Sequence, residues 1–192
     1  FIVLSNDTNP NAMQRLAENL TSIVDSDFVV DQFRFSLGVS IGVACYPEHG
    51  HDLDSLIRAA DIAMYEAKKH KNSIRYFEPQ MQQSYLRRIL IEQKLRSALT
   101  ENELYVVYQP KVSIDGKLLG VEALARWENA DLGNVLPDQF IQVAETSGMM
   151  SSIGQFILST ALSEMAQVQK ETGVKFPVSV NISVRQFFQE HF

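Results

Sequence analysis

The segment from Val121 to Trp127 (Val-Glu-Ala-Leu-Ala-Arg-Trp) constrains the fold of this chain more than any other. Side chains of a β-strand alternate between its two faces. One face here is apolar throughout, while the other carries Glu122, Leu124 and Arg126. The carboxylate and the guanidinium are about 13 Å apart along a strand, and such charges are costly in a buried strand unless a ligand, a metal or water meets them. The segment therefore predicts a strand that serves a site, or a half-exposed strand with two solvated charges.

The composition bounds the class of protein. The 192 residues, 45% hydrophobic and 21% charged, predict one or two ordinary globular domains. The net charge of −6 argues against a nucleic-acid polymer as partner. The single Cys45 fits a reducing compartment. The chain contains neither a long apolar run nor a signal-peptide pattern, so we expect a soluble, cytoplasmic chain, whose longer parent could still carry a membrane anchor.

The first 78 residues alternate strand and helix patterns, which predicts one α/β or α+β domain. We expect strands at 1–5, 33–46 and 74–77, and helices at 10–25 and from about Asp52 through Ala67. Segment 33–46 is either one long strand or a strand pair, and Gly38 and Gly42 inside it indicate a bulge or a close backbone approach. A strand that begins at the first residue also leads us to expect missing upstream sequence.

The remaining residues predict a second unit. Segment 79–102 is a helix that either connects two domains or opens the second one. Two strands, 104–113 and 117–127, flank Asp115-Gly116, a hairpin signal that makes them antiparallel. We then expect a helix at 137–145 ended by Gly148, a long helix capped by Ser151 and ended before Gly173, and a strand at 176–182. Ser179 and Asn181 share the polar face of that last strand.

Glu122-Ala123-Leu124 followed by Ala125-Arg126-Trp127 resembles the signature strand of the EAL family of cyclic di-GMP phosphodiesterases. The resemblance extends from about residue 84 to the end of the chain. The other matching segments, in the family's order and spacing, are Tyr108-Gln109-Pro110, the run from Gly133 through Pro137 and Phe140 to Glu145, and Val180-Asn181-Ile182-Ser183 with Gln186.

The first half contains three notable segments: Ser40-Ile41-Gly42-Val43-Ala44, Tyr46-Pro47, and the run from Leu56 to Lys68. Together they are similar to the C-terminal half of a GGDEF (diguanylate cyclase) domain. By resemblance, Lys68 reaches a nucleotide phosphate, and GTP is the ligand that this half implies. The following Lys69-His70-Lys71-Asn72-Ser73 departs from the usual family ending, which puts GTP use in doubt. A solvated helix face is the alternative interpretation of Lys68.

The two resemblances together imply the fold class: a partial α+β, cyclase-like domain at 1–78, a connecting helix at 79–102, and the start of a modified (β/α)₈ barrel with an antiparallel first strand at 103–192. They also imply the site. Glu122 is the catalytic residue, Glu122 and Asn181 are ligands of Mg²⁺ or Mn²⁺, and Gln109, Leu124 and Arg126 contact cyclic di-GMP, with Arg126 on a phosphate. Hard oxygen donors suit these two cations. Asn181 as a backbone-bonding residue and Gln109 as a strand-end polar residue remain alternatives.

The resemblance implies that the parent protein hydrolyses cyclic di-GMP to linear pGpG; the alternative is a non-catalytic receptor or regulatory module. A (β/α)₈ barrel needs roughly 250 residues, and a two-metal site needs several carboxylates. We therefore expect the 192-residue chain alone to be inactive. Exposed strand edges would make its second unit unstable, oligomeric or strand-swapped. An upstream sensory domain and a homodimer are expected of the parent.

Overall fold

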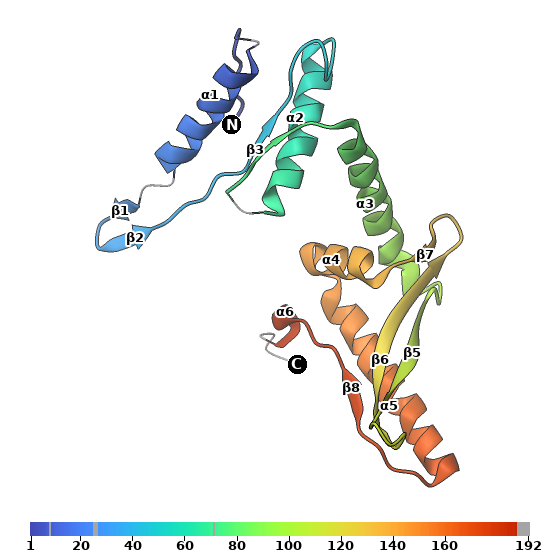
Figure 1. The fold of residues 1–192 in the computed structure, drawn as a ribbon. Coiled ribbons are helices and arrows are strands. Elements are labelled where there is room, and N and C mark those ends of the chain that lie inside the picture. Colours follow the sequence, from blue (N-terminus) through green and yellow to red (C-terminus); the bar gives the residue numbers. More distant parts are fainter. Residues whose placement is uncertain (8, 25–26, 71, 188–192) are drawn as a thin grey trace. The chain divides into compact units, whose positions relative to one another are not determined.

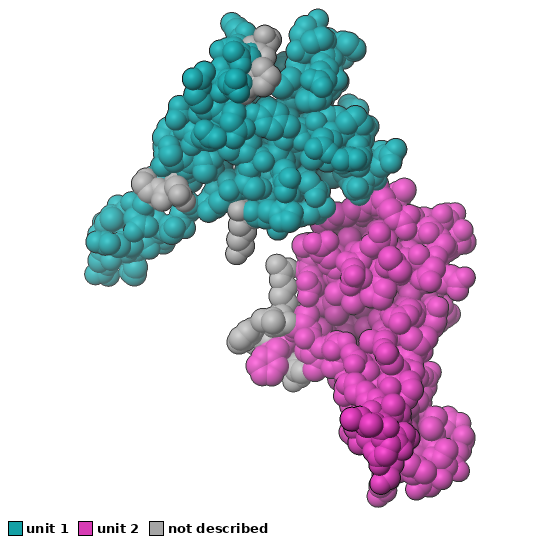
Figure 2. All heavy atoms as spheres, in the orientation of Figure 1, with its two compact units in different colours: residues 1–86 teal, residues 87–192 magenta. Residues whose placement is uncertain are grey.

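The computed structural model describes residues 1–7, 9–24, 27–70 and 72–187. The chain divides into two compact units, residues 1–86 and residues 87–192, coloured separately in Figure 2. The division falls inside helix α3 (Pro79–Ala98), which therefore begins in the first unit and ends in the second. Within the described ranges, no helix combines the length and the hydropathy that a membrane crossing requires.

The first unit contains two small sheets and two helices that precede α3 (Figure 1). Its elements are α1 (Pro10–Val24), β1 (Phe28–Val30), β2 (Phe33–Phe35), β3 (Ile41–Val43), α2 (Leu53–Lys68) and β4 (Ile74–Tyr76). Strands β1 and β2 form an antiparallel hairpin, whereas β3 and β4 are parallel and are joined through α2. Asp52 caps α2, since its side chain accepts a hydrogen bond of 2.7 Å from the backbone N–H of Ser55.

The helices predicted at 10–25 and from Asp52 through Ala67 and the strand predicted at 74–77 correspond to α1, α2 and β4, and residue 25 lies outside the described residues. Two other expectations for the first unit were wrong. Segment 1–5 pairs with no strand of the described chain and its side chains are exposed, so its apolar letters alone did not make a strand. Segment 33–46 contains β2 and β3, which belong to separate sheets, and β1 was not anticipated. The close backbone approach at Gly42 is confirmed, because a Cβ there would lie 2.0 Å from the carbonyl oxygen of Ala60.

The second unit is built on a long hairpin with two short strands beside it. Its elements after α3 are β5 (Leu104–Val112), β6 (Leu118–Asn129), β7 (Gly133–Val135), α4 (Pro137–Ser147), α5 (Met150–Thr172), β8 (Val178–Val180) and α6 (Val184–Phe187). Strand β6 pairs antiparallel with β5 and β7 and parallel with β8. The hairpin predicted at Asp115-Gly116 is confirmed, and Gly116 has a φ of 81°, which glycine adopts without strain.

Helices cover one face of this sheet. Trp127 of β6 and Phe140 of α4 are both 0% exposed, and their rings meet edge to face with centroids 5.8 Å apart. Helix α5 runs along the same face in Figure 1 and contributes Ile153 and Ile157 to the buried cluster. The members of that cluster are Ile91, Leu95, Ala98, Leu104, Ala125, Trp127, Val135, Phe140, Val143, Ala144, Met150, Ile153 and Ile157. The apolar face predicted for β6 is therefore the packed face.

Helices α4 and α5 end at the predicted glycines, but α5 does not begin at the predicted serine cap. Gly148 and Gly173 end the two helices with φ angles of 77° and 70°, as expected for left-handed C-terminal caps. The cap predicted at Ser151 is wrong, because α5 begins one residue earlier at Met150, after Met149, and no side chain caps it. The N–H of Met149 instead donates to the carbonyl of Ala144, and this turn sets the helix start.

Candidate functional site

The pairing of three strands brings the predicted polar residues onto the face of the sheet that the helices leave open. Gln109 of β5 lies directly opposite Glu122 of β6, and Ser179 of β8 lies beside Glu122 on the other edge. Paired residues of neighbouring strands share a face. Because faces repeat every two residues, Lys111 and Asn181 lie on this face as well.

Glu122 is the centre of the polar contacts on the open face. The Nδ2 group of Asn181 donates to Oε1 of Glu122 at 2.9 Å, and Nζ of Lys111 lies 3.1 Å from Oε2. The hydrogen bond from Asn181, followed by the hydrogen bond and the charge of Lys111, lowers the pKa of Glu122 below its ordinary value. The carboxylate is therefore ionised at neutral pH, with a partner on each oxygen.

Arg126, Leu124 and Gln109 lie on the same face but outside this contact cluster. The Nη1 group of Arg126 donates to the carbonyl oxygen of Ala125 at 2.7 Å, so the guanidinium folds back on its own strand. Leu124 is half-buried between the two charged positions, and Gln109 is exposed. The structure thus brings Glu122 and Asn181 together and leaves the other three residues as neighbours along the face.

The two oxygen-bearing residues occupy different places along their strands. Asn181 directly follows the last residue of β8, at the carboxyl end where barrel sites lie. Glu122 instead lies well inside β6, and the part of β6 beyond Arg126 pairs with β7 as a hairpin. Asn181 therefore lies at the carboxyl end of its strand, whereas Glu122 lies within its strand.

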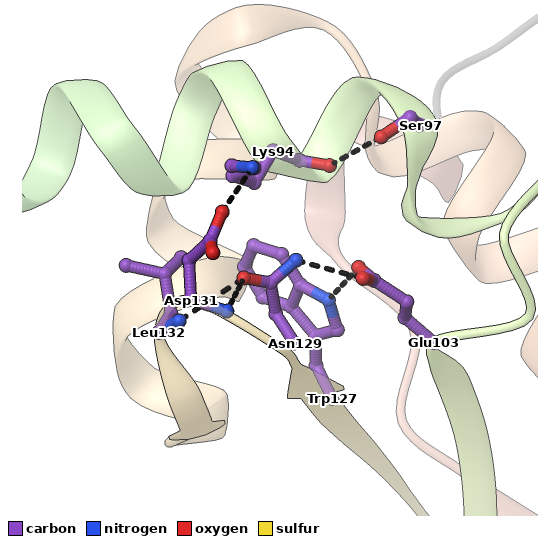
Figure 3. A network of polar contacts seen from close by, with 7 residues as sticks. All are labelled: Lys94, Ser97, Glu103, Trp127, Asn129, Asp131 and Leu132. Atoms are coloured by element: carbon purple, nitrogen blue, oxygen red, sulfur yellow. Dashed lines mark hydrogen bonds and ion pairs between the residues drawn. The ribbon is translucent and has the colours of Figure 1, made fainter.

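A buried polar network anchors the far end of β6 (Figure 3). The carboxylate of Glu103, which precedes β5, accepts hydrogen bonds from Nε1 of Trp127 at 3.0 Å and from Nδ2 of Asn129 at 2.7 Å. The Oδ1 atom of Asn129 in turn accepts from the backbone N–H of Asp131 at 3.0 Å. These contacts satisfy the indole and the buried amide, so they fix β6 against the start of β5.

Helix α3 joins the same network through an ion pair. Nζ of Lys94 contacts Oδ2 of Asp131 in the turn between β6 and β7 (Figure 3). The hydrogen bond and the charge of Asp131 raise the pKa of Lys94. Both side chains are well exposed, and exposed pairs contribute little to stability. The ion pair therefore orients the turn more than it stabilises the unit.

The donor set around Glu122 fits part of a divalent-cation site. A carboxylate oxygen and an amide oxygen on neighbouring strands are hard donors, which Mg²⁺ and Mn²⁺ prefer. Asn181 turns its nitrogen toward Glu122, and a rotated amide would present Oδ1 to the same place. The described part of the chain gathers no group of three His, Cys, Asp or Glu side chains around a common point. It therefore supplies two ligands of a site and not the whole site.

Lys68 lies in the other unit, exposed at the last position of α2. A cation at the C-terminal end of a helix is favoured by the helix dipole, which is a structural reason for its presence. The neighbouring Lys69 forms an ion pair of 2.6 Å with Glu66. Phosphate contact by Lys68 stays a prediction.

Lys111 is the functional candidate that the sequence analysis missed. It stands in a stretch of β5 that gives no local sign of a site, directly after Tyr108-Gln109-Pro110. Its contact with Glu122 depends on the pairing of two strands, in which Lys111 is diagonal to Glu122. An alternation analysis of both strands, combined with the register set by the hairpin turn, is the signal that could have found it.

Comparison with known proteins supports both halves of the sequence interpretation. The EAL domain family matches residues 92–192, and the diguanylate cyclase GGDEF domain family matches residues 1–73. Cyclic di-GMP phosphodiesterase PdeR of Escherichia coli strain K12 is 33% identical over 187 residues, which are 97% of this chain and 28% of PdeR. The bifunctional diguanylate cyclase/cyclic di-GMP phosphodiesterase MucR of Pseudomonas aeruginosa is 33% identical over 189 residues, again 97% of this chain and 28% of that protein.

A solved structure gives the same result for the fold. The PaMucR phosphodiesterase in complex with c-di-GMP superimposes with a TM-score of 0.51 and 35% identity, over 53% of this chain and 41% of that one. The chain spans little more than a quarter of the length of the two curated relatives. It belongs to the EAL domain family, and its first 73 residues match the GGDEF domain that precedes the EAL domain in a tandem signalling protein.

Proposed function

We propose that the parent of this chain is a metal-dependent phosphodiesterase that hydrolyses cyclic di-GMP to linear pGpG. The single observation that carries the proposal is the contact of Glu122 with Asn181 across β6 and β8, at 2.9 Å. It places two hard oxygen-bearing side chains on the open face of an EAL-type sheet. The relatives named as cyclic di-GMP phosphodiesterases support the substrate class.

Two residues of the open face would bind the cation, and three others would bind the substrate. Glu122 and Asn181 would hold Mg²⁺ or Mn²⁺, and Glu122 is in that sense the catalytic residue. When bound, the cation neutralises phosphate oxygens and lowers the pKa of a bound water toward about 7. Glu122, whose pKa lies below its ordinary value, is ionised at neutral pH, as a ligand of the cation must be.

Arg126, Gln109 and Leu124 position the dinucleotide. Arg126 leaves the carbonyl of Ala125 and binds a phosphate in two-pronged geometry. Hydrogen bonds to charged groups contribute about 1.5–3 kcal/mol net, so this contact decides much of the affinity. Gln109, opposite Glu122, contacts the dinucleotide from β5, and Leu124 packs against a base or a ribose.

We place the parts of the parent as a GGDEF portion at 1–78, a connecting helix at 79–102 and an EAL portion at 103–192. The GGDEF family match ends at residue 73, near the first boundary, and the EAL family match begins at residue 92, inside the proposed connecting helix. We also propose that the parent is cytoplasmic, forms a homodimer and has an upstream sensory domain. GTP would bind near Lys68. Because the described residues supply only two metal ligands, we expect the 192-residue chain by itself to be inactive.

One observation favours a second function. Lys111 forms an ion pair with Glu122, so the open face also suits a receptor that binds cyclic di-GMP and does not hydrolyse it. A receptor needs the contacts of Arg126, Gln109 and Leu124, whereas catalysis additionally needs the cation at Glu122.

The full-length parent distinguishes the two functions. We expect it to convert cyclic di-GMP to pGpG with Mg²⁺ or Mn²⁺, and Glu122→Gln to lower kcat by about 100-fold or more, since even residues that only support metal ligands contribute 10–100-fold. Lys117→Gln, at an exposed hairpin position, is the matched control. Binding of cyclic di-GMP without turnover by the wild type would replace the phosphodiesterase with the receptor.

A further inference from the structure

The ion pair of Lys111 with Glu122 has no role in the proposed hydrolysis of cyclic di-GMP. The ammonium of Lys111 lies 3.1 Å from Oε2 of Glu122, while Asn181 takes Oε1. The contact follows from the strand register: Gln109 is opposite Glu122, and Lys111 is two residues further on the same face. Diagonal neighbours of this kind are within reach of long side chains. The ion pair is therefore built into the hairpin.

The residue opposite Lys111 leaves room for this contact. That residue is Gly120, which has no side chain to stand between Lys111 and Glu122. A Cβ at Gly120 would lie 2.8 Å from the carbonyl oxygen of Pro177, so the approach of the segment before β8 excludes one. The same backbone approach that brings β8 beside β6 thus keeps the path of Lys111 open.

The ion pair is easily broken. The side chains of Lys111 and Glu122 are 46% and 28% exposed, and partly exposed pairs are weak and screened by salt. A divalent cation binds carboxylate oxygens at about 2.0–2.2 Å. A cation on Oε2 would therefore lie at most about 5 Å from an ammonium that stayed on that oxygen, and the two would repel each other.

We propose that Lys111 is a displaceable counter-ion of Glu122. Its ammonium neutralises the carboxylate when no divalent cation is bound, and it competes with the cation for Oε2. The cation binds only as Lys111 swings away, so Lys111 lowers the affinity of the site. This inference rests on the proposed function, because it concerns the metal that Glu122 and Asn181 would hold.

A Mn²⁺ titration of the protein tests the competition without any assay of catalysis. Paramagnetic broadening of the Asn181 side-chain amide signals in NMR spectra reports on Mn²⁺ at the neighbouring Glu122, including weak binding. Lys111→Met keeps the length of the side chain and removes its charge. We expect half-maximal broadening of this variant at a Mn²⁺ concentration about three- to tenfold lower than for the wild type, as two repelling charges near a surface predict.

Three variants complete the experiment. Lys111→Arg keeps the cation and should retain the wild-type midpoint. Lys117→Met removes a lysine that pairs with Asp115 in the hairpin turn, and it should leave the midpoint unchanged. Glu122→Gln should abolish the broadening. Thermal unfolding of each variant confirms that the protein is folded during the titration.

The failures of this inference and of the proposed function are distinguishable. A wild-type protein that shows Glu122-dependent broadening, with an unchanged or higher midpoint in Lys111→Met, overturns the counter-ion role and leaves the metal site standing. A wild-type chain that shows no Glu122-dependent broadening at millimolar Mn²⁺ overturns the competition between Lys111 and the cation, and the same result for the full-length parent overturns the metal site as well.

Discussion

The two faces of β6 are stabilised by different interactions, although their side chains alternate along the same strand. On the closed face Trp127 is 0% exposed and packs against Phe140. On the open face Glu122 stays 28% exposed and is held by Asn181 and Lys111 at distances of 2.9 and 3.1 Å. Burial of apolar side chains stabilises the closed face, whereas a hydrogen bond and an ion pair position the side chains of the open face.

One strand can therefore stabilise the fold through one face and present ligand-binding residues on the other. Shifting the register by one residue would exchange the two faces, so the packed side also fixes which residues reach the open side. The network of Glu103, Trp127 and Asn129 then locks the strand at its far end. We therefore expect substitutions on the closed face to unfold the unit, and substitutions on the open face to change titration and ligand binding while the fold persists.

The largest effect is expected from Trp127→Ala. Removing a fully buried indole costs about 3–5 kcal/mol through lost burial and the cavity left behind. It also leaves Oε2 of Glu103 without its donor. Since small domains are stable by about 5–15 kcal/mol, urea unfolding followed by circular dichroism should show a large loss of stability of the second unit.

Leu124→Ala is the matched control on the open face of the same strand. Its side chain is only half-buried, so we expect a loss of about 1 kcal/mol or less. Equal losses for the two variants would contradict the contrast between a packed and an open face.

A smaller effect on stability is expected from Gly154→Ala in α5, and its sign should depend on the side chain of Gln186. A Cβ there would lie 1.7 Å from Nε2 of Gln186, a buried side chain whose Oε1 accepts from the N–H of Ser183 just after Asn181. Gly154→Ala therefore pushes Gln186 away and disturbs the turn that carries Asn181. We expect a net loss of about 1 kcal/mol, since leaving a buried polar group without its partner costs about 1–3 kcal/mol and outweighs the gain of about 0.5–1 kcal/mol from the helix propensity of alanine.

The sign should reverse when Gln186 is first shortened. In a Gln186→Ala background the added methyl group meets no amide, so Gly154→Ala should stabilise by about 0.5–1 kcal/mol through helix propensity alone. Chemical unfolding of the four proteins of this cycle measures both values. A loss of equal size in both backgrounds would mean that Gln186 is not the obstacle.

The alternation of β6 and the hairpin turn were enough to predict the centre of the second unit. The closed face and the antiparallel pairing follow from period-two alternation and from Asp115-Gly116. The proximity of Glu122 to Asn181 was implied only by the resemblance to the EAL family. Lys111 escaped prediction because its partner is defined only by the register of two strands. The anchoring of Trp127 by Glu103, 24 positions away, likewise leaves no local pattern.

The first unit was harder to predict from local patterns. Segment 1–5 has the apolar letters of a strand, but a strand also needs a neighbour for its backbone groups, and the described chain provides none. The hairpin of β1 and β2 was missed because its turn uses Asp31 with a φ of 55° instead of the usual Asn-Gly or Asp-Gly pair. Ser151 looked like a helix cap by residue type, although the chain geometry starts α5 at Met150.

The smallest effect is expected on the open face, at the titration of Glu122. Asn181→Ala removes the strongest cause of its lowered pKa, so the pKa should rise toward the ordinary value while Lys111 still holds it somewhat below. Because folding lowers this pKa, the contribution of Glu122 to stability is complete above its ordinary value and is lost as pH falls through the lowered one. NMR titration of the Glu122 carboxyl carbon in metal-free protein measures the change. Asn134→Ala on β7 is the control that should leave it unchanged. An unmoved pKa in Asn181→Ala would show that Lys111, and not the hydrogen bond from Asn181 across β6 and β8, lowers the pKa of Glu122.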